Sequence, residues 1–209
     1  MSSPAPAGAP GDGRALRPAV FLDRDGTINR DIGYLYRHED FVWIDGAPGA
    51  LARLQKAGLA LVVVSNQSGV ARGLYGQEDV RELHRRINLD LRQNHGAGID
   101  AWYFCPHLPD AGCPCRKPSP GMLLSAAEDL GLDLSRSYMV GDKELDVGAG
   151  LAAGVRFPVL VRTAYGLEAQ GRLPAGVPVA DDLPGAAELI LKDFLQDKYE
   201  PACRRTRFP

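Results

Sequence analysis

Residues 19–27 read Ala-Val-Phe-Leu-Asp-Arg-Asp-Gly-Thr, a short apolar run that leads into two aspartates and a glycine. The apolar run is typical of a buried β-strand, and the glycine favours a turn directly after it. Similar apolar runs follow at 59–64, 101–104, 138–140 and 158–161. Between and after these runs, apolar residues recur at helical spacing at 48–56, 78–94, 120–130, 144–153 and 184–195. Strands that alternate with helices predict an α/β fold, a doubly wound parallel sheet with helices on both faces.

The composition is typical of a globular protein and excludes several classes of function. Of the 209 residues, 45% are hydrophobic and 24% are charged, and the net charge is −2. Because no excess of positive charge would attract phosphates or anionic lipids, we expect no nucleic-acid partner and no membrane partner. The longest apolar run, 59–64, is far shorter than the roughly 20 residues that span a bilayer.

The ends of the chain differ from its middle. Residues 1–18 are rich in Ala, Pro, Gly and Ser and lack the apolar core of a secretory signal. We therefore predict a disordered tail at 1–18, a single folded domain at 19–195, and a short C-terminal tail at 196–209. Three of the four cysteines fall within 105–115, which favours a metal site in a reducing compartment over disulfides. We expect a cytoplasmic protein and a monomer.

Polar residues directly follow the predicted strands. Asp23 and Asp25 follow the first strand, Ser65 the second and Asp142 the fourth. In parallel sheets, ligands bind beyond the carboxyl ends of the strands. Solubility does not require this arrangement, whereas an active site would produce it.

Asp23 and Asp25 allow two interpretations. A polar strand end before a glycine turn would involve no chemistry. Alternatively, Asp23 is a nucleophile that forms an aspartyl-phosphate, and Asp25 protonates the leaving alkoxide and then deprotonates the attacking water.

Asp142 lies in the segment Gly-Asp-Lys-Glu-Leu-Asp at 141–146. Together with Asp23 it would form a hard oxygen site that suits Mg²⁺, although an exposed helix N-cap is the alternative. Asp146, one turn into the helix, is expected to cap the helix or to support the site rather than to bind the metal.

Ser65 and Lys117 add a hydroxyl and a cation, the groups that a phosphoryl group in transfer requires. Each alone could equally be a polar turn or a surface lysine. The order nucleophile, hydroxyl, lysine and carboxylate on successive sheet elements is much harder to obtain by chance.

A second constellation consists of Cys105, His107, Cys113 and Cys115, three thiols and one imidazole within 11 residues. Three cysteines and a histidine form a standard tetrahedral zinc set, and four protein ligands indicate a structural rather than a catalytic ion. Buried cysteines beside a chance histidine are the alternative. Since Cys115 lies two residues before Lys117, zinc would fix the loop that presents Arg116 and Lys117.

The phosphoryl-transfer motifs resemble those of the haloacid dehalogenase (HAD) superfamily over about residues 19–195. The resemblance implies that Asp23 is the nucleophile and Asp25 the general acid/base, and that Ser65 and Lys117 hold the phosphoryl group. It further implies that Mg²⁺ binds Asp23, the Asp25 carbonyl and Asp142. The nearest family types have no large cap domain, and the loops 29–43 and 68–77 would shield the site instead.

Within the superfamily, the zinc motif resembles a small group that contains D-glycero-D-manno-heptose 1,7-bisphosphate phosphatases and histidinol-phosphate phosphatases. The stretches 21–29, 61–73, 115–122 and 138–146 resemble the heptose enzymes, whereas the five residues between His107 and Cys113 resemble the histidinol-phosphate branch. The resemblance implies that Arg116 sets substrate recognition. The full set of implied substrate contacts is Asp31, Ile32, Gly33, Tyr34, Ser65, Asn66, Gln67, Ser68, Arg116, Lys117 and Lys143.

The sequence thus predicts an Mg²⁺-dependent phosphatase, also carrying Zn²⁺, that converts a phosphorylated sugar, heptose 1,7-bisphosphate, to the 1-phosphate. Histidinol-phosphate phosphatase is the alternative enzyme. A catalytically silent, zinc-stabilised binding module is the alternative from another class, and it leaves the intact set of catalytic elements unexplained. A phosphatase of DNA ends would need a basic, aromatic-rich groove that the sequence does not suggest.

Overall fold

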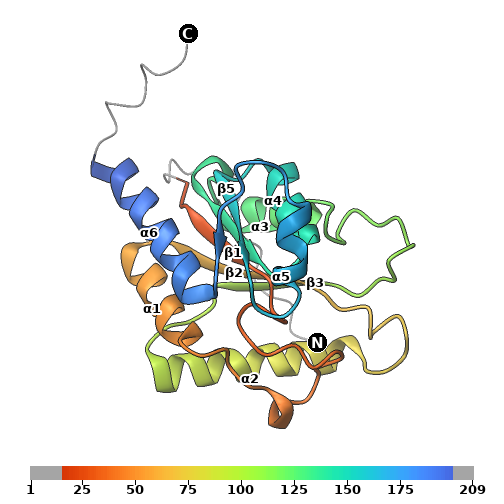
Figure 1. Cartoon of the computed structure of the whole chain (residues 1–209). Helices are drawn as coiled ribbons and strands as arrows, with labels where there is room; N and C mark the ends of the chain where they lie inside the picture. The colour runs from red at the N-terminus through yellow and green to blue at the C-terminus, as the bar shows by residue number, and fades with distance from the viewer. Residues whose placement is uncertain (1–15, 200–209) are drawn as a thin grey trace.

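The computed structural model describes residues 16–199, and its centre is a parallel sheet of six strands in the order β3-β2-β1-β4-β5-β6 (Figure 1). The predicted α/β architecture is confirmed. The strands are β1 (Ala19–Leu22), β2 (Ala60–Asn66), β3 (Ala101–Cys105), β4 (Tyr138–Gly141), β5 (Phe157–Val161) and β6 (Val179–Ala180). The helices are α1 (Ala47–Ala57), α2 (Gln77–His95), α3 (Gly121–Leu130), α4 (Glu144–Ala153), α5 (Gly166–Ala169) and α6 (Leu183–Tyr199). The 3-10 helices are η1 (His38–Asp40), η2 (Leu134–Arg136) and η3 (Gln170–Arg172).

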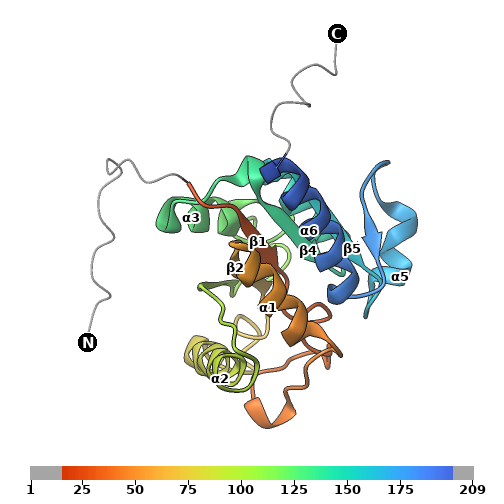
Figure 2. The ribbon, with the colours of Figure 1, turned by 90° about the vertical axis from the view of Figure 1, so that its left-hand side faces the viewer.

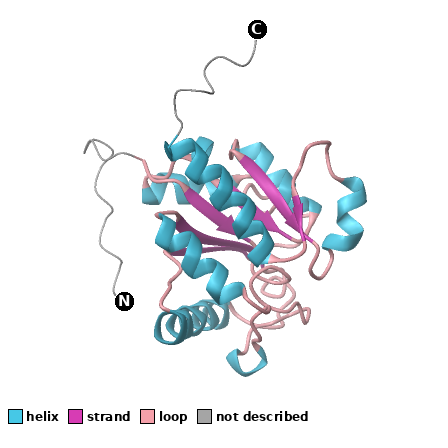
Figure 3. Cartoon of the chain, turned by 60° about the vertical axis from the view of Figure 1, so that its left-hand side comes forward, coloured by secondary structure: helices cyan, strands magenta, loops and turns pink. Residues whose placement is uncertain are grey.

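Helices cover both faces of the sheet, as Figures 2 and 3 show. Side chains alternate along a strand, so Val20 and Leu22 of β1 pack with α1 and α6, whereas Phe21 packs with α3 and α4 on the other face. Because both faces are buried, the central strands are apolar throughout rather than at every second position.

Glycines end three of these helices where the sequence predicts an end. Gly58, Gly131 and Gly154 follow α1, α3 and α4 with φ angles of 103°, 63° and 74°. This left-handed conformation is costly for residues with a Cβ, so glycine fixes where each helix stops and the chain turns toward the next strand.

The strand order places the predicted site. From β1 the chain passes outward to β2 and β3, and then returns to β4 on the other side of β1. The carboxyl ends of β1, β2 and β4 are therefore neighbours, at the switch point where ligands bind in such sheets. The connections around this edge, 23–46, 67–76 and 106–120, contain only the 3-10 helix η1, so nothing in the described chain there has the size of a cap domain.

The structure differs from the predicted boundaries at several points. Strand β6 and helix α5 are too short, at two and four residues, to give a periodic sequence pattern. The last helix continues to Tyr199 rather than ending at 195, and the Arg17 amide donates to the Gly131 carbonyl at 3.0 Å, so 16–18 joins the fold. The remaining predicted tail residues, with Cys203, lie outside the described residues. Among the described helices, none is long and apolar enough to cross a membrane.

Candidate active site

Lys117 is the centre of a buried charged cluster at the carboxyl ends of β1 and β4. Its Nζ lies 2.6 Å from Asp23 Oδ1 and 2.6 Å from Asp146 Oδ1, and it donates to the Val64 carbonyl at 2.8 Å. Burial acts to lower the pKa of Lys117, but the carboxylates of Asp146 and Asp23 outweigh it and raise the pKa. Burial raises the pKa of Asp23 to about 6, although the Lys117 charge opposes the shift. The lysine therefore stays cationic beside the predicted nucleophile.

Asp142 lies next to Asp23 in a position that suits a metal ion. Burial and the nearby charge of Asp23 raise the pKa of Asp142 to about 8, against the effect of Lys143. One carboxylate oxygen, Oδ1, is buried without a hydrogen-bond partner. Oxygens of Asp23, Asp142 and Asp146 lie within 4.8 Å of one another. A buried carboxylate oxygen with no partner, among further carboxylates, fits a hard divalent cation such as Mg²⁺.

Asp146 caps helix α4, as its spacing predicts. Its Oδ2 accepts a hydrogen bond from the Lys143 backbone N–H at 2.9 Å and so caps α4, while Oδ1 pairs with Lys117. One carboxylate thus fixes both the start of a helix and the lysine of the site.

Asp25 is held by three neighbouring side chains. Arg24 Nη2 lies 2.9 Å from its Oδ2, Asn29 Nδ2 donates to Oδ1 at 3.0 Å, and Gln67 Nε2 donates to Oδ2 at 3.0 Å. Gln67 also donates to Ser65 Oγ at 2.8 Å. Donors on both oxygens fix the orientation of the Asp25 carboxylate.

Arg24 itself is fully buried, and its guanidinium forms hydrogen bonds with several neighbouring groups. It donates to the Leu35 carbonyl at 2.9 Å, and its Nη1 lies 3.3 Å from His84 Nε2. Burial and the charge of Arg24 hold the pKa of His84 well below its ordinary value. The imidazole is therefore neutral and accepts from the guanidinium, and its ring stacks on Trp102 with centroids 4.4 Å apart.

The end of β2 joins this network to the segment that carries the lysine. Ser65 is buried, and with Asp23, Asp25, Lys117 and other side chains it lines a small polar hollow. Asn66 lines the same hollow, and its amide exchanges two 3.1 Å hydrogen bonds with the backbone of Lys117. Asn66 therefore aligns the Lys117 segment with β2.

Lys143 brings the 31–34 loop to the same edge. Its Nζ lies 3.5 Å from Asp31 Oδ2 and 3.8 Å from Asp142 Oδ2. Burial acts to lower the pKa of Lys143, but Asp142, Asp23 and Asp31 raise it. Within the loop, Asp31 Oδ1 accepts from the Gly33 amide at 2.8 Å, and the side chains of Ile32 and Tyr34 are exposed.

Seven predicted substrate contacts do not line the hollow: four belong to the loop just described, Asp31, Ile32, Gly33 and Tyr34, and the others are Gln67, Ser68 and Arg116. The side chain of Gln67 is buried against Asp25 and Ser65, and its Oε1 accepts from the Tyr75 hydroxyl at 2.9 Å. Ser68 lies one residue further along and is only half-buried. Arg116 turns to the zinc-ligand loop, where Nη1 donates to the His107 carbonyl at 3.1 Å. The structure thus gathers Ser65, Asn66, Lys117 and Lys143 around the hollow that Asp23 lines, and leaves the other predicted substrate contacts outside it.

The four predicted zinc ligands converge. The sulfur atoms of Cys105, Cys113 and Cys115 lie 3.2 to 3.5 Å apart, and His107 Nδ1 is 3.4 Å from two of them. A tetrahedron with Zn–S bonds near 2.3 Å has edges of roughly 3.8 Å, so these donors stand close to the corners of a zinc site. Cys105 is fully buried in the core on the α3 face, and the ligand loop leads directly to Lys117.

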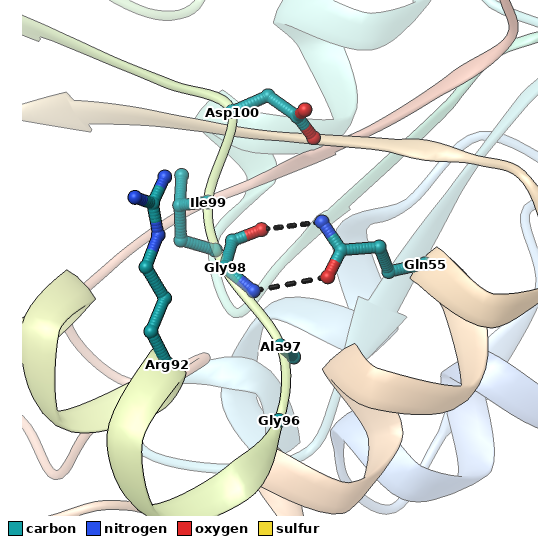
Figure 4. Close-up of a pocket in the computed structure, with 7 residues that line it drawn as sticks. All are labelled: Gln55, Arg92, Gly96, Ala97, Gly98, Ile99 and Asp100. Atoms are coloured by element: carbon teal, nitrogen blue, oxygen red, sulfur yellow. Dashed lines mark hydrogen bonds between the residues drawn. The ribbon is translucent and has the colours of Figure 1, made fainter.

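A larger hollow of about 330 Å³ lies at the opposite edge of the sheet, before the start of β3 (Figure 4). There the Gln55 amide exchanges hydrogen bonds of 3.0 and 2.8 Å with the Gly98 backbone. Arg92 and Asp100 line the hollow. No predicted site residue lies there, whereas the smaller hollow at the carboxyl edge contains several.

Sequence analysis missed Arg24, Tyr75, His84 and Tyr165. Tyr165 lies beside Lys143, whose Nζ is 4.6 Å from its ring centroid.

The fold and the buried Asp–Lys–Asp cluster define a hydrolase of the HAD type. In agreement, a model of the HAD-hydrolase-like family matches residues 114–186.

Curated relatives indicate the family within the HAD-type hydrolases to which the chain belongs. The chain is 44% identical over 184 residues to D-glycero-beta-D-manno-heptose-1,7-bisphosphate 7-phosphatase of Photorhabdus laumondii. The alignment covers 84% of this chain and 97% of that protein. The Escherichia coli K12 enzyme of the same name is 43% identical, covering 85% and 90%. The chain belongs to the family of heptose bisphosphate phosphatases.

A solved structure agrees with this assignment. D,D-heptose 1,7-bisphosphate phosphatase from B. bronchiseptica, complexed with magnesium and phosphate, superposes with a TM-score of 0.78 at 37% identity. The alignment covers 84% of this chain and 99% of that one.

Proposed function

We propose that the protein is an Mg²⁺-dependent phosphatase that removes the 7-phosphate of D-glycero-β-D-manno-heptose 1,7-bisphosphate and leaves the 1-phosphate. The observation that carries the proposal is the pairing of Asp23 with Lys117 at 2.6 Å beside Asp142, whose buried oxygen has no partner. This arrangement, in a chain of the family named above, suits the cleavage of a phosphate monoester.

The reaction would run in two steps on Asp23. A carboxylate oxygen of Asp23 attacks the phosphorus and forms an aspartyl-phosphate, while Asp25 protonates the departing sugar alkoxide. Asp25, now a carboxylate, then takes a proton from water, which attacks the phosphorus and releases phosphate. Ser65 and Lys117 bind the oxygens of the phosphoryl group, so that its charge is stabilised as it moves.

Asp23 and Asp142, with the Asp25 carbonyl, would hold Mg²⁺. The ion supplies positive charge that reduces the repulsion between the Asp23 carboxylate and the phosphate dianion. Cys105, His107, Cys113 and Cys115 would hold zinc in a closed site that supports the loop before Lys117.

Specificity for a bisphosphate would come from two cations beside Lys117. Lys143 lines the hollow, and Arg116 lies one residue before Lys117, so a second phosphate has cations within reach at the rim. The open edge, without a cap domain, suits a compact, highly charged sugar. Asp31, Ile32, Gly33, Tyr34, Asn66, Gln67 and Ser68 would complete the substrate contacts.

The protein would act in the cytoplasm as a monomer. Three thiols at metal-ligand distances fit a reducing compartment, where cysteines stay available to a metal. Light scattering of the purified protein tests the oligomeric state.

A substrate panel tests the function. Phosphate release is measured from heptose 1,7-bisphosphate, histidinol phosphate and fructose 1,6-bisphosphate, and the heptose product is identified by ³¹P NMR. We expect the highest kcat/KM for the heptose bisphosphate, with only the 1-phosphate formed. A higher kcat/KM for histidinol phosphate would refute the proposal in favour of that enzyme, and Asp23→Asn serves as the control for contaminating phosphatases.

A further inference from the structure

The turn that joins β5 to α5 is unusually constrained. Ala164 has a φ of 45°, and it is the one non-glycine residue of the described chain with a positive φ. A side chain at Gly166 would place its Cβ 1.7 Å from the Val161 carbonyl oxygen. A non-glycine residue in this conformation is costly and is maintained only where the surrounding structure enforces it.

The same turn is bonded to the site on two sides. The Thr163 hydroxyl donates to the Gly26 carbonyl, directly after Asp25, and the Tyr165 backbone N–H donates to Asp142 Oδ2 at 3.2 Å. The position of Tyr165 is therefore fixed relative to the predicted nucleophile loop and the predicted metal ligand.

The side chain of Tyr165 is not part of the buried core. It is 52% exposed, and its hydroxyl has no hydrogen bond among the described residues. Its ring instead faces Lys143, whose Nζ lies 4.6 Å from the ring centroid. An ammonium group over an aromatic face is attracted by the ring, so the ring restricts where the flexible lysine can lie.

We propose that Tyr165 is a positioning residue that holds the Lys143 ammonium at the rim of the site, where it selects substrates with a second phosphate. Lys143 Nζ also lies 3.5 Å from Asp31 Oδ2 and 3.8 Å from Asp142 Oδ2, and these carboxylates attract it. The aromatic face balances this attraction. This inference rests on the proposed function in one respect, namely that Lys143 binds the distal phosphate.

The test compares Tyr165→Leu with Tyr165→Phe. Leucine keeps the backbone N–H that Asp142 accepts but removes the aromatic face, whereas phenylalanine keeps the face. For the bisphosphate, we expect Tyr165→Leu to raise KM by about 2- to 30-fold with kcat changed less than twofold, the range of a cation–π contact. Tyr165→Phe should restore KM to within about twofold of wild type. For p-nitrophenyl phosphate, which has no second phosphate, the KM should rise less than twofold.

A double-mutant cycle shows whether Tyr165 acts through the lysine. In a Lys143→Met background, Tyr165→Leu should have no further effect on KM. Leu167→Ala is the matched surface control, because the Leu167 side chain is 62% exposed and lies two residues from Tyr165 in the chain. Its KM should match that of wild type.

The outcomes separate the two proposals, because the cycle is measured on the heptose bisphosphate whichever substrate the panel favours. Equal KM values for Tyr165→Leu and Tyr165→Phe, or effects of Tyr165→Leu and Lys143→Met that simply multiply, would overturn the role of Tyr165. A wild type that prefers a monophosphate would overturn the proposed substrate, whatever the cycle shows.

Discussion

Replacing Arg24 by methionine should destabilise the protein and impair turnover together. Its guanidinium is fully buried, lies 2.9 Å from Asp25 and bonds to Leu35, Gln67 and His84. Methionine has a similar length but no donors, so the buried acceptors lose a partner and Asp25 keeps only its amide donors. Breaking a buried ion pair by removing one partner costs about 3 to 5 kcal/mol.

Urea unfolding measures this cost. With a slope near 2.5 kcal/mol per molar urea, the midpoint should fall by about 1 to 2 M. Arg24→Lys should lose part of this amount, because an ammonium keeps the charge but cannot bond both carboxylate oxygens as a fork does. Arg53→Met is the matched control, since Arg53 lies at the surface, 3.9 Å from Glu188, and should change stability by less than about 0.5 kcal/mol.

The same variant is assayed for turnover. The assay is run without urea, at a temperature where Arg24→Met is folded. We expect kcat to fall by at least about tenfold, because the predicted acid/base loses its fixed orientation. A free energy of unfolding within about 1 kcal/mol of wild type, together with an unchanged kcat, would refute the view that this arginine holds Asp25.

Four further outcomes are expected. Asp23→Asn should lower kcat by at least about 1000-fold with an unchanged circular dichroism spectrum, since an amide does not attack phosphorus; turnover within about tenfold of wild type would contradict this. Arg116→Ala should lower kcat/KM for the bisphosphate by about 10- to 1000-fold, or about 1.4 to 4 kcal/mol, and change a monophosphate far less; equal losses on both would place the arginine in the chemical step. Reduced protein should contain about one zinc per chain by elemental analysis, and Cys115→Ser should lower both zinc content and Tm; protein that is stable without zinc would rule out the site. Because the pKa of His84 is held low in the folded protein, the unfolded chain takes up a proton near pH 6.5 that the folded one does not, so stability should fall as the pH drops below that value. Urea titrations at pH 7 and pH 5 should show a smaller fall for His84→Phe, and equal falls would show that this histidine is not the cause.

The fold and the predicted catalytic positions were accessible from the sequence for one physical reason. A parallel sheet requires apolar strands buried on both faces, so polar residues directly after such a run stand out, as Asp23 and Asp142 do. The convergence of the four predicted zinc ligands was also accessible, because they lie in one short loop.

The side chains that hold the predicted catalytic residues in place could not be predicted in the same way. Two partners of Arg24, Gln67 directly after β2 and His84 in α2, are 43 and 60 residues away in the chain. Which polar side chains meet depends on the order of the strands, and the sequence pattern does not contain that order. Tyr165 is a similar case, since an exposed tyrosine in a short turn gives no signal until β5 is placed beside β4.

The two predicted metal sites differ in when a growing chain could complete them. All four zinc ligands lie between Cys105 and Cys115, so they are present together before β4 has been synthesised. The magnesium site joins Asp23, near the start of the folded chain, to Asp142, and it cannot exist until β4 has inserted beside β1. Contacts between neighbouring residues form faster than contacts that close long loops. During synthesis, the zinc loop can therefore become ordered first and hold Lys117 in place when the last aspartate arrives.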